Sequence, residues 1–89
     1  MIKTAITITN KLGLHARASA KLSKLAGSFP CEVWMTRSGR RINAKSIMGV
    51  MMLAAGMGAE VELETSGVQE QEAMEALRTM IADKFGEGE

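Results

Sequence analysis

Residues 2–27 have the sequence IKTAITITNKLGLHARASAKLSKLAG, along which the spacing of the apolar residues changes once. From Ile2 to Ile8, every second residue suits a buried face, and this period of two predicts a half-buried strand. Residues 10–13 interrupt the alternation. From residue 16 to Gly27, apolar side chains recur every three or four positions, as they do on the buried face of a helix. The stretch therefore predicts a strand, a loop and a helix that ends at Gly27.

The same two periods place the other elements of the fold. We expect strands over residues 31–36, 40–43 and 60–65, with Ser38 and Gly39 in a tight turn between the first two. We also expect a short helix after Ser46 and a final helix that ends at Gly86. The final helix has acids in its first turn and Lys84 in its last turn, as the helix dipole favours. The apolar residues on its buried face are Ala73, Met74, Leu77, Met80, Ile81 and Phe85. The order β-α-β-β-α-β-α is typical of an α+β open-faced sandwich with two layers, in which a four-stranded antiparallel sheet carries three helices on one face. The other face of the sheet would turn Lys3, Trp34, Glu60, Glu62 and Glu64 toward solvent.

The composition indicates one small folded domain that spans residues 1–89. Hydrophobic residues make up 46% of the chain, which is enough for a core and excludes a disordered protein. Three residues are aromatic and eight are methionine, so we expect an aliphatic core and adaptable contacts wherever methionine reaches the surface.

Three features of the sequence favour a soluble protein of the cytoplasm. The single cysteine, Cys31, cannot form an internal disulfide, and its place at the start of a predicted strand favours burial. The N-terminus lacks the basic segment and apolar block of a signal peptide. The longest run of apolar residues and glycine, residues 47–59, is too short to span a bilayer. We therefore expect no membrane partner.

Charge is distributed unevenly along the chain, although the net charge is only +1. Residues 1–45 hold nine basic residues and one acid, whereas residues 46–89 hold two basic residues and nine acids. This asymmetry predicts a basic face and an acidic face. A basic face can bind nucleic acid, phosphate or an acidic protein, so charge alone leaves these three kinds of partner open.

His15 is the only histidine, and it precedes the helix predicted to begin at Ala16. The first N–H groups of a helix, here those of Ala16, Arg17 and Ala18, are unpaired and attract anions. An imidazole in this position can attack phosphorus, and Arg17 can bind phosphate oxygens with its planar guanidinium. On spacing alone, an ordinary surface histidine is the better interpretation, because a histidine and an arginine two positions apart are a common pair. We expect no metal site, because there is no second histidine and no cysteine pairs with His15.

Ser46 stands before a short helix that is apolar on all sides. Serine is a good N-cap, and as a cap alone it would contribute about 1 kcal/mol. Val50 and Leu53 can enter the core, which leaves other apolar side chains at the surface. These are Ile47, Met48 and Met51. An exposed patch of aliphatic residues and methionine is typical of an adaptable protein-docking surface.

Two segments at a fixed separation, GLHARAS at 13–19 and KSIMGV at 45–50, resemble HPr, the histidine-containing phosphocarrier of the bacterial phosphotransferase system. The resemblance covers essentially the whole chain in length, element order and motif spacing. It implies that enzyme I, charged by phosphoenolpyruvate, phosphorylates His15 on Nδ1 beside Arg17, and that sugar-specific enzyme IIA proteins accept the group. It also implies a stoichiometric carrier without a cofactor, rather than a stand-alone enzyme.

The resemblance further implies regulation and docking. Ser46 would be phosphorylated by a dedicated ATP-dependent kinase, the HPr serine kinase/phosphorylase, and we expect the carrier to be a monomer. The docking surface would comprise Ala20, Lys24, Lys45, Ile47, Met48 and Met51. One position departs from the family, which usually has proline directly after the arginine, where this chain has Ala18. Alanine relaxes the first helical turn and adds an N–H donor, so the contacts to phosphate would differ in detail.

Three other functions compete with a sugar-transport carrier. A small basic nucleic-acid binder would need aromatic residues to stack on bases, and Trp34 is the single exposed candidate. A homologue that works only through Ser46 would not need His15. A carrier of the nitrogen-related phosphotransferase branch would share both sites, and the sequence separates it poorly from a sugar carrier.

Overall fold

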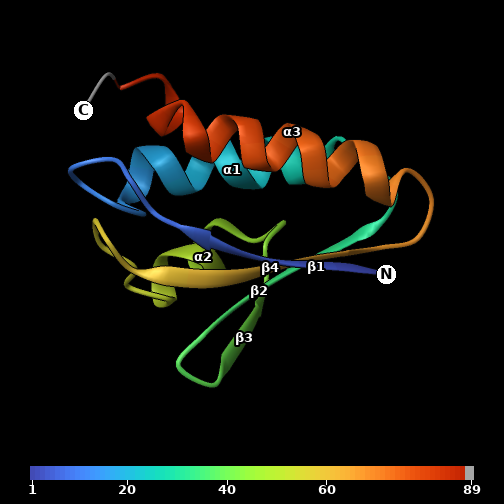
Figure 1. Cartoon of the computed structure of the whole chain (residues 1–89), viewed down its shortest axis with the longest axis horizontal. Helices are drawn as coiled ribbons and strands as arrows, with labels where there is room; N and C mark the ends of the chain where they lie inside the picture. Colours follow the sequence, from blue (N-terminus) through green and yellow to red (C-terminus); the bar gives the residue numbers. More distant parts are fainter. Residues whose placement is uncertain (88–89) are drawn as a thin grey trace.

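Four strands form one antiparallel sheet in the computed structural model, which describes residues 1–87 of the 89. They are β1 (Ile2–Thr7), β2 (Glu32–Arg37), β3 (Arg40–Asn43) and β4 (Glu60–Ser66). Their order in the sheet is β1-β4-β2-β3, so the last strand of the sequence pairs with both the first and the second. β1 and β3 are the edge strands, and the closed end of the β2–β3 hairpin extends away from the first and last helices (Figure 1).

The helices cover one face of this sheet. They are α1 (Ala16–Gly27), α2 (Ile47–Met52) and α3 (Glu70–Ala82), and a short 3₁₀ turn, η1 (Lys84–Gly86), follows the last. α1 and α3 lie side by side over the sheet, and α2 packs against α1 and β3 (Figure 1). This arrangement confirms the predicted α+β open-faced sandwich.

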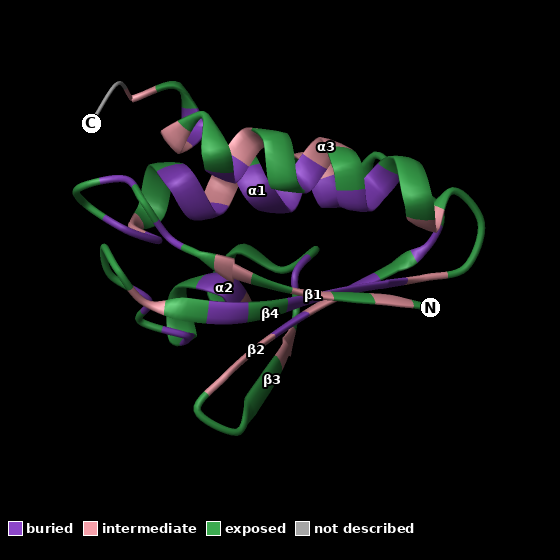
Figure 2. Ribbon diagram, viewed as in Figure 1, coloured by how far each residue is buried: buried purple, intermediate pink, exposed green. Residues whose placement is uncertain are grey.

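The core lies between the two layers and is aliphatic, as predicted. In Figure 2 the buried residues of α1 and α3 line the side that faces the sheet. The most deeply buried apolar side chains, each at most 1% exposed, include Ile8, Leu22, Val33, Met35, Val50, Val61, Leu63, Leu77 and Ile81. Cys31 is buried with them, which also confirms the prediction.

The turn between β2 and β3 follows the predicted chemistry. Ser38 and Gly39 have φ values of 51° and 81°, so both central residues are left-handed. This geometry matches the twist of the flanking strands and is the usual one for a two-residue hairpin loop. It pairs Arg37 with Arg40 at the closed end of the hairpin.

The last helix ends earlier than its periodicity predicts. α3 ends at Ala82, whereas the apolar spacing extends to Phe85. Lys84 and Phe85 have φ values of 54° and 56°, which a right-handed helix excludes. Lys84 is therefore not in the last turn of α3, although the prediction placed it there. Phe85 is still only 3% exposed, because the turn returns its side chain to the core.

Two smaller expectations also need correction. β1 ends at Thr7, because the N–H of Ile8 donates instead to the carbonyl of Ala59, at 2.9 Å. Glu64 lies on the outer face of the sheet but is only 7% exposed. Its Oε2 lies 3.1 Å from the guanidinium of Arg41, which also stacks 4.0 Å above the ring of Trp34.

Candidate functional site

His15 is the N-cap of α1. Its backbone is extended, with φ −73° and ψ 179°, and its carbonyl accepts the first helical hydrogen bond, from the N–H of Ser19 at 2.8 Å. The imidazole makes no capping bond to the backbone, so the N–H groups of the first turn keep their affinity for an anion. The ring is 28% exposed and can be reached by another molecule.

The loop before His15 is held against a second loop, the one that leads into β4. The N–H of Leu14 donates to the carbonyl of Ala55 at 2.8 Å, and the buried hydroxyl of Ser19 donates to the carbonyl of Leu14 at 3.0 Å. Gly13 has a φ of +65°, and a Cβ on it would lie 2.5 Å from the oxygen of Ala55. Glycine is therefore required for both the backbone conformation and the close approach.

Both ring nitrogens of His15 face acceptor atoms. Nδ1 lies 3.0 Å from the carbonyl oxygen of Gly13. Nε2 lies 3.1 Å from Oε2 of Glu87, a distance that makes an ion pair when the ring is protonated. The contact between Nε2 and Oε2 does not have the geometry of a hydrogen bond, so Oε2 of Glu87 has no hydrogen-bond partner.

Glu87 was not predicted, and no local signal in the sequence points to it. Its other oxygen, Oε1, accepts a hydrogen bond from Nδ2 of Asn10 at 3.0 Å, although the two residues are 77 positions apart. The left-handed backbone at Lys84 and Phe85 precedes Glu87. The C-terminal end of the described chain and the loop after β1 lie at the same end of the molecule (Figure 1).

A cavity of about 680 Å³, which we call the His15 cavity, adjoins the start of α1. Arg17, the other predicted member of the site, lines it together with His15 and Ala16. Among the described residues, Lys11, Lys21 and Glu87 also line it. Lys21 donates to the carbonyl of Phe85 at 2.7 Å. The guanidinium of Arg17 beside the start of a helix suits a bound anion such as a phosphoryl group.

Ser46 and α2 have the geometry expected from the sequence. Ser46 is an exposed N-cap, and its hydroxyl accepts a hydrogen bond from the N–H of Gly49 at 3.1 Å. Val50 and Leu53 are buried. The predicted apolar side chains are exposed, together with one that was missed, and we call these four the α2 patch: Ile47 (45%), Met48 (68%), Met51 (38%) and Met52 (57%).

The other predicted docking residues lie on or beside α1 and α2. Lys24 is exposed and Ala20 half-buried on α1, which packs against α2. Lys45 is exposed as well, but its Nζ donates to the carbonyl of Phe29 at 2.8 Å and is thereby anchored.

Two arginines of the β2–β3 hairpin hold the end of α2, which the sequence did not indicate. Arg37 donates to the carbonyl oxygens of Leu53 and Ala54, at 2.9 and 3.3 Å. Arg40 donates to the carbonyl oxygen of Met52 at 3.2 Å. The last carbonyls of a helix have no partner within it, and cationic donors stabilise them. The hairpin therefore positions the helix that carries the α2 patch.

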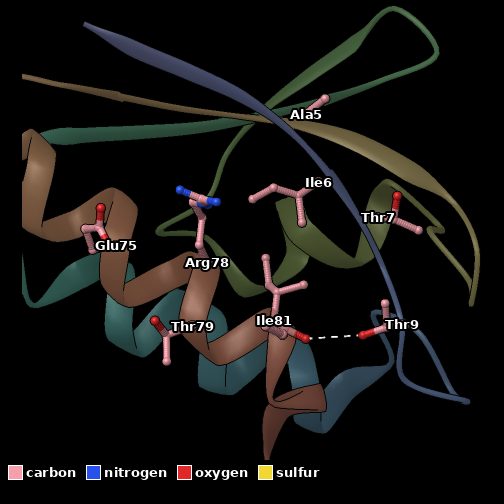
Figure 3. Close-up of a pocket in the computed structure, with 9 residues that line it drawn as sticks. Ala5, Ile6, Thr7, Thr9, Glu75, Arg78, Thr79 and Ile81 are labelled. Carbon is pink, nitrogen blue, oxygen red and sulfur yellow. Dashed lines mark hydrogen bonds between the residues drawn. The ribbon is translucent and has the colours of Figure 1, made fainter.

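A second cavity, of about 410 Å³, lies between β1 and α3 (Figure 3). Glu75 and Arg78 line it from α3, and the hydroxyl of Thr9 donates to the carbonyl of Ile81 beside it, at 3.4 Å. None of the predicted site residues lines this cavity.

Neither a metal cluster nor a membrane span is found in the part of the chain that the structure describes. Across residues 1–87, no three histidine, cysteine or acidic side chains are grouped to hold a metal ion. Among the same residues, no helix is long and apolar enough to cross a bilayer.

A family model, relatives by sequence and relatives by structure all match this chain, and they agree with one another. The family described as "PTS HPr component phosphorylation site" matches residues 2–83. The phosphocarrier protein HPr of Cupriavidus necator is 65% identical over 89 residues, which is all of both chains. The structure of HPr-C-His from Thermoanaerobacter tengcongensis superposes with a TM-score of 0.94 at 42% identity, over 98% of each chain. An HPr dimer from the same organism matches with a TM-score of 0.79 at 42% identity, over 98% of this chain and 100% of that one.

Proposed function

Since the chain belongs to the HPr family of phosphocarriers of the phosphotransferase system, we propose that His15 accepts a phosphoryl group from phosphorylated enzyme I and passes it to sugar-specific enzyme IIA proteins. In this proposal residues 1–89 act as one cytoplasmic carrier domain. The carrier is stoichiometric and turns over only through its partners.

One observation carries the proposal: the imidazole of His15 stands at the uncapped start of α1, in a cavity that Arg17 also lines. During transfer, a ring nitrogen attacks phosphorus while the bond from phosphorus to the donor breaks. The catalytic task is then positioning and neutralisation of charge on the phosphoryl oxygens. The N–H groups of Ala16, Arg17 and Ala18 and the guanidinium of Arg17 supply that neutralisation.

The α2 patch is the proposed docking surface, with Ala20, Lys24 and Lys45 beside it. Methionine side chains adapt to differently shaped partners, which suits a protein that must meet a donor and then an acceptor. Ser46 lies next to this surface. Phosphorylation of Ser46 by the serine kinase would add about −1.5 to −2 charges there, and would weaken docking to an acidic partner without melting the helix.

The nucleic-acid alternative rests on the basic first half of the chain and has one candidate stacking residue. Trp34, the one aromatic residue expected to stack on bases, already has the guanidinium of Arg41 4.0 Å above its ring. The nitrogen-related branch is the second candidate, because it uses the same histidine chemistry.

The test of the proposal separates the two branches. The full chain is mixed with phosphoenolpyruvate and, separately, with the enzyme I of each branch, and acid-labile phosphate is followed by intact mass. We expect labelling with the sugar-branch enzyme and none in a His15→Ala variant that keeps its circular dichroism spectrum. Labelling of that variant would exclude His15 as the only acceptor.

The proposal also concerns the state of assembly. We expect a monomer, because docking on the α2 patch requires that no second copy covers it. Sedimentation of the unphosphorylated chain checks this expectation, and is relevant because one structural relative is described as an HPr dimer.

A further inference from the structure

Methionine is concentrated at the surface of one short helix. α2 has six residues, and three of them, Met48, Met51 and Met52, are methionines that are 68%, 38% and 57% exposed. Oxidants attack the thioether sulfur of methionine, and the product, a sulfoxide, is polar. The α2 patch therefore presents several oxidisable side chains to solvent within two turns of helix.

The sulfur atoms outside α2 divide into buried and exposed ones. Met35 and Met74 are 0% and 3% exposed, and Cys31, the only cysteine, is 2% exposed. Met1 and Met57 are 69% and 65% exposed, and neither belongs to the α2 patch. An oxidant that meets the folded chain therefore reaches α2, Met1 and Met57 before it reaches the sulfur atoms of the core.

The contacts that hold α2 in place are made by other groups. At the start of the helix, the hydroxyl of Ser46 accepts from the N–H of Gly49 at 3.1 Å. At its end, Arg37 and Arg40 donate to backbone carbonyl oxygens. Val50 is fully buried and fixes the helix to the core. A chemical change at the exposed sulfur atoms therefore leaves α2 in position and alters only the polarity of its surface.

We propose that the α2 patch is a site of reversible methionine oxidation, and that conversion of Met48, Met51 and Met52 to sulfoxides weakens the docking of enzyme I. This proposal rests on the proposed function, in which the patch is the docking surface. The oxygen of a sulfoxide must lose its water when the apolar surface of a partner covers it. Burial of a polar group without a hydrogen-bond partner is unfavourable, so docking is weaker after oxidation.

The oxidant is a peroxide, and with hydrogen peroxide the step balances without any other reactant. A lone pair of the methionine sulfur attacks one peroxide oxygen, and the O–O bond breaks. The proton of the transferred oxygen passes to the leaving hydroxide, which becomes water. Sulfur is oxidised and the peroxide oxygens are reduced. Methionine sulfoxide reductases reverse the change: two thiols become a disulfide, and the sulfoxide oxygen leaves as water.

Oxidation of the patch should change docking and leave the chemistry of the ring unaltered. Among the described residues, no methionine lines the His15 cavity. The phosphorylation rate at saturating carrier should therefore stay constant while KM for the carrier rises. A general loss of structure would instead lower Tm and the rate at saturation together.

The test compares the full chain before and after treatment with dilute hydrogen peroxide, which catalase removes before enzyme I is added. Peptide mass spectrometry locates the sulfoxides. Steady-state phosphorylation by enzyme I gives KM and the rate at saturation, and a calorimetric titration with enzyme I gives Kd without any phosphoryl transfer.

Two variants assign the effect to particular sulfur atoms. The triple variant Met48→Leu, Met51→Leu, Met52→Leu keeps α2 apolar but removes its sulfur. The matched control is Met57→Leu, which removes an exposed sulfur outside the patch. Each protein is compared with its own untreated form, so any effect of leucine itself cancels.

In the unaltered chain and in Met57→Leu, we expect sulfoxides at α2 before Met35 and Met74 are oxidised. We expect KM and Kd to rise about ten-fold, with Tm and the rate at saturation unchanged. In the triple-leucine variant, peroxide should change neither KM nor Kd. Treatment of the oxidised chain with both methionine sulfoxide reductases should restore the original values.

Three results would overturn the inference: a Kd that does not change on oxidation, an equal response of the triple-leucine variant, or a Tm that falls as docking weakens. Absence of labelling in the untreated, unaltered chain would instead count against the proposed function. In that case the titration would still decide whether oxidation of α2 weakens the binding of enzyme I.

Discussion

Replacement of Gly13 by alanine tests whether the close approach of two loops holds the functional site. Gly13 has a φ of +65°, and a Cβ on it would lie 2.5 Å from the carbonyl oxygen of Ala55 and 2.6 Å from Cα of Gly56. Both neighbours are backbone atoms, so neither can rotate away. The Gly13→Ala variant must therefore move one loop relative to the other.

The matched control is Gly39→Ala in the β2–β3 turn. Gly39 also has a positive φ, of +81°, but nothing lies within 4 Å of its Cβ position. Both substitutions put alanine in a left-handed conformation, at a cost of roughly 1–2 kcal/mol. Both also reduce the freedom of the unfolded chain to the same extent, so that effect cancels. The difference between the two variants isolates the steric contact.

Forcing extra volume into a packed site costs about 1–3 kcal/mol. We therefore expect the free energy of unfolding to fall by about 2–5 kcal/mol in Gly13→Ala and by about 1–2 kcal/mol in Gly39→Ala. For a domain of this size, each kcal/mol corresponds to about 4–8 °C in Tm. Urea denaturation followed by circular dichroism measures the free energies, and thermal melting provides a second estimate.

The same pair of variants links stability to function. The carbonyl of Gly13 contacts Nδ1 of His15, so a displaced loop changes the ring's position. We expect Gly13→Ala to be phosphorylated more slowly by enzyme I, and Gly39→Ala to be phosphorylated at the normal rate. If the two variants lose equal stability and are labelled equally fast, the contact between Gly13 and Ala55 does not hold the site.

Three further predictions concern the α2 patch and the N-terminus. Ser46→Asp should slow phosphorylation of His15 without lowering Tm, because a helix start tolerates negative charge, whereas Ser46→Ala should keep the normal rate; equal rates would leave Ser46 as an ordinary cap. Arg37→Ala should lower stability by about 1–2 kcal/mol and weaken partner binding in a titration, because two carbonyls at the end of α2 lose their donor; unchanged stability would show that these bonds are not needed. The N–H of Gly67, and then the N-terminal ammonium, lower the pKa of Glu70, so its stabilising contribution is present at neutral pH and is lost as the pH falls through that lowered value. Acetylation of the N-terminus should raise the pKa of Glu70 part of the way back in an NMR titration, and no change would exclude the ammonium as a cause.

The sequence predicted those strands and helices in which buried and exposed side chains recur with a simple period. β4 is an example, because Val61 and Leu63 face the core and Glu60 and Glu62 face solvent along one short strand. The start of α1 was also predictable, since a helix pattern begins directly after His15. Local patterns suffice in these cases because the burial of each side chain depends on its own strand or helix.

Other features depend on contacts that no local pattern carries. The periodicity of α3 continues to Phe85, yet the backbone turns left-handed at Lys84, a residue type with no special preference for that conformation. Arg37 and Arg40 reach from a hairpin to the end of another helix. The sequence predicts only that these two arginines belong to a basic face, because it does not show which carbonyl oxygens lie near their side chains.

The surroundings of His15 are more rigid than the α2 patch, and this difference suits a carrier. His15 follows a loop whose residues Asn10 and Gly13 are buried, and the nucleophile is thereby held in one place, as transfer to phosphorus requires. The α2 patch instead presents three methionines on a six-residue helix, and their flexible side chains can repack against different partners. In the proposed function, a fixed nucleophile beside an adaptable docking surface would allow the same histidine to be presented first to a donor and then to several acceptors. The arginines that hold α2 are then needed to keep this surface at a constant distance from His15, which is why their loss should affect partner binding more than the chemistry of the ring.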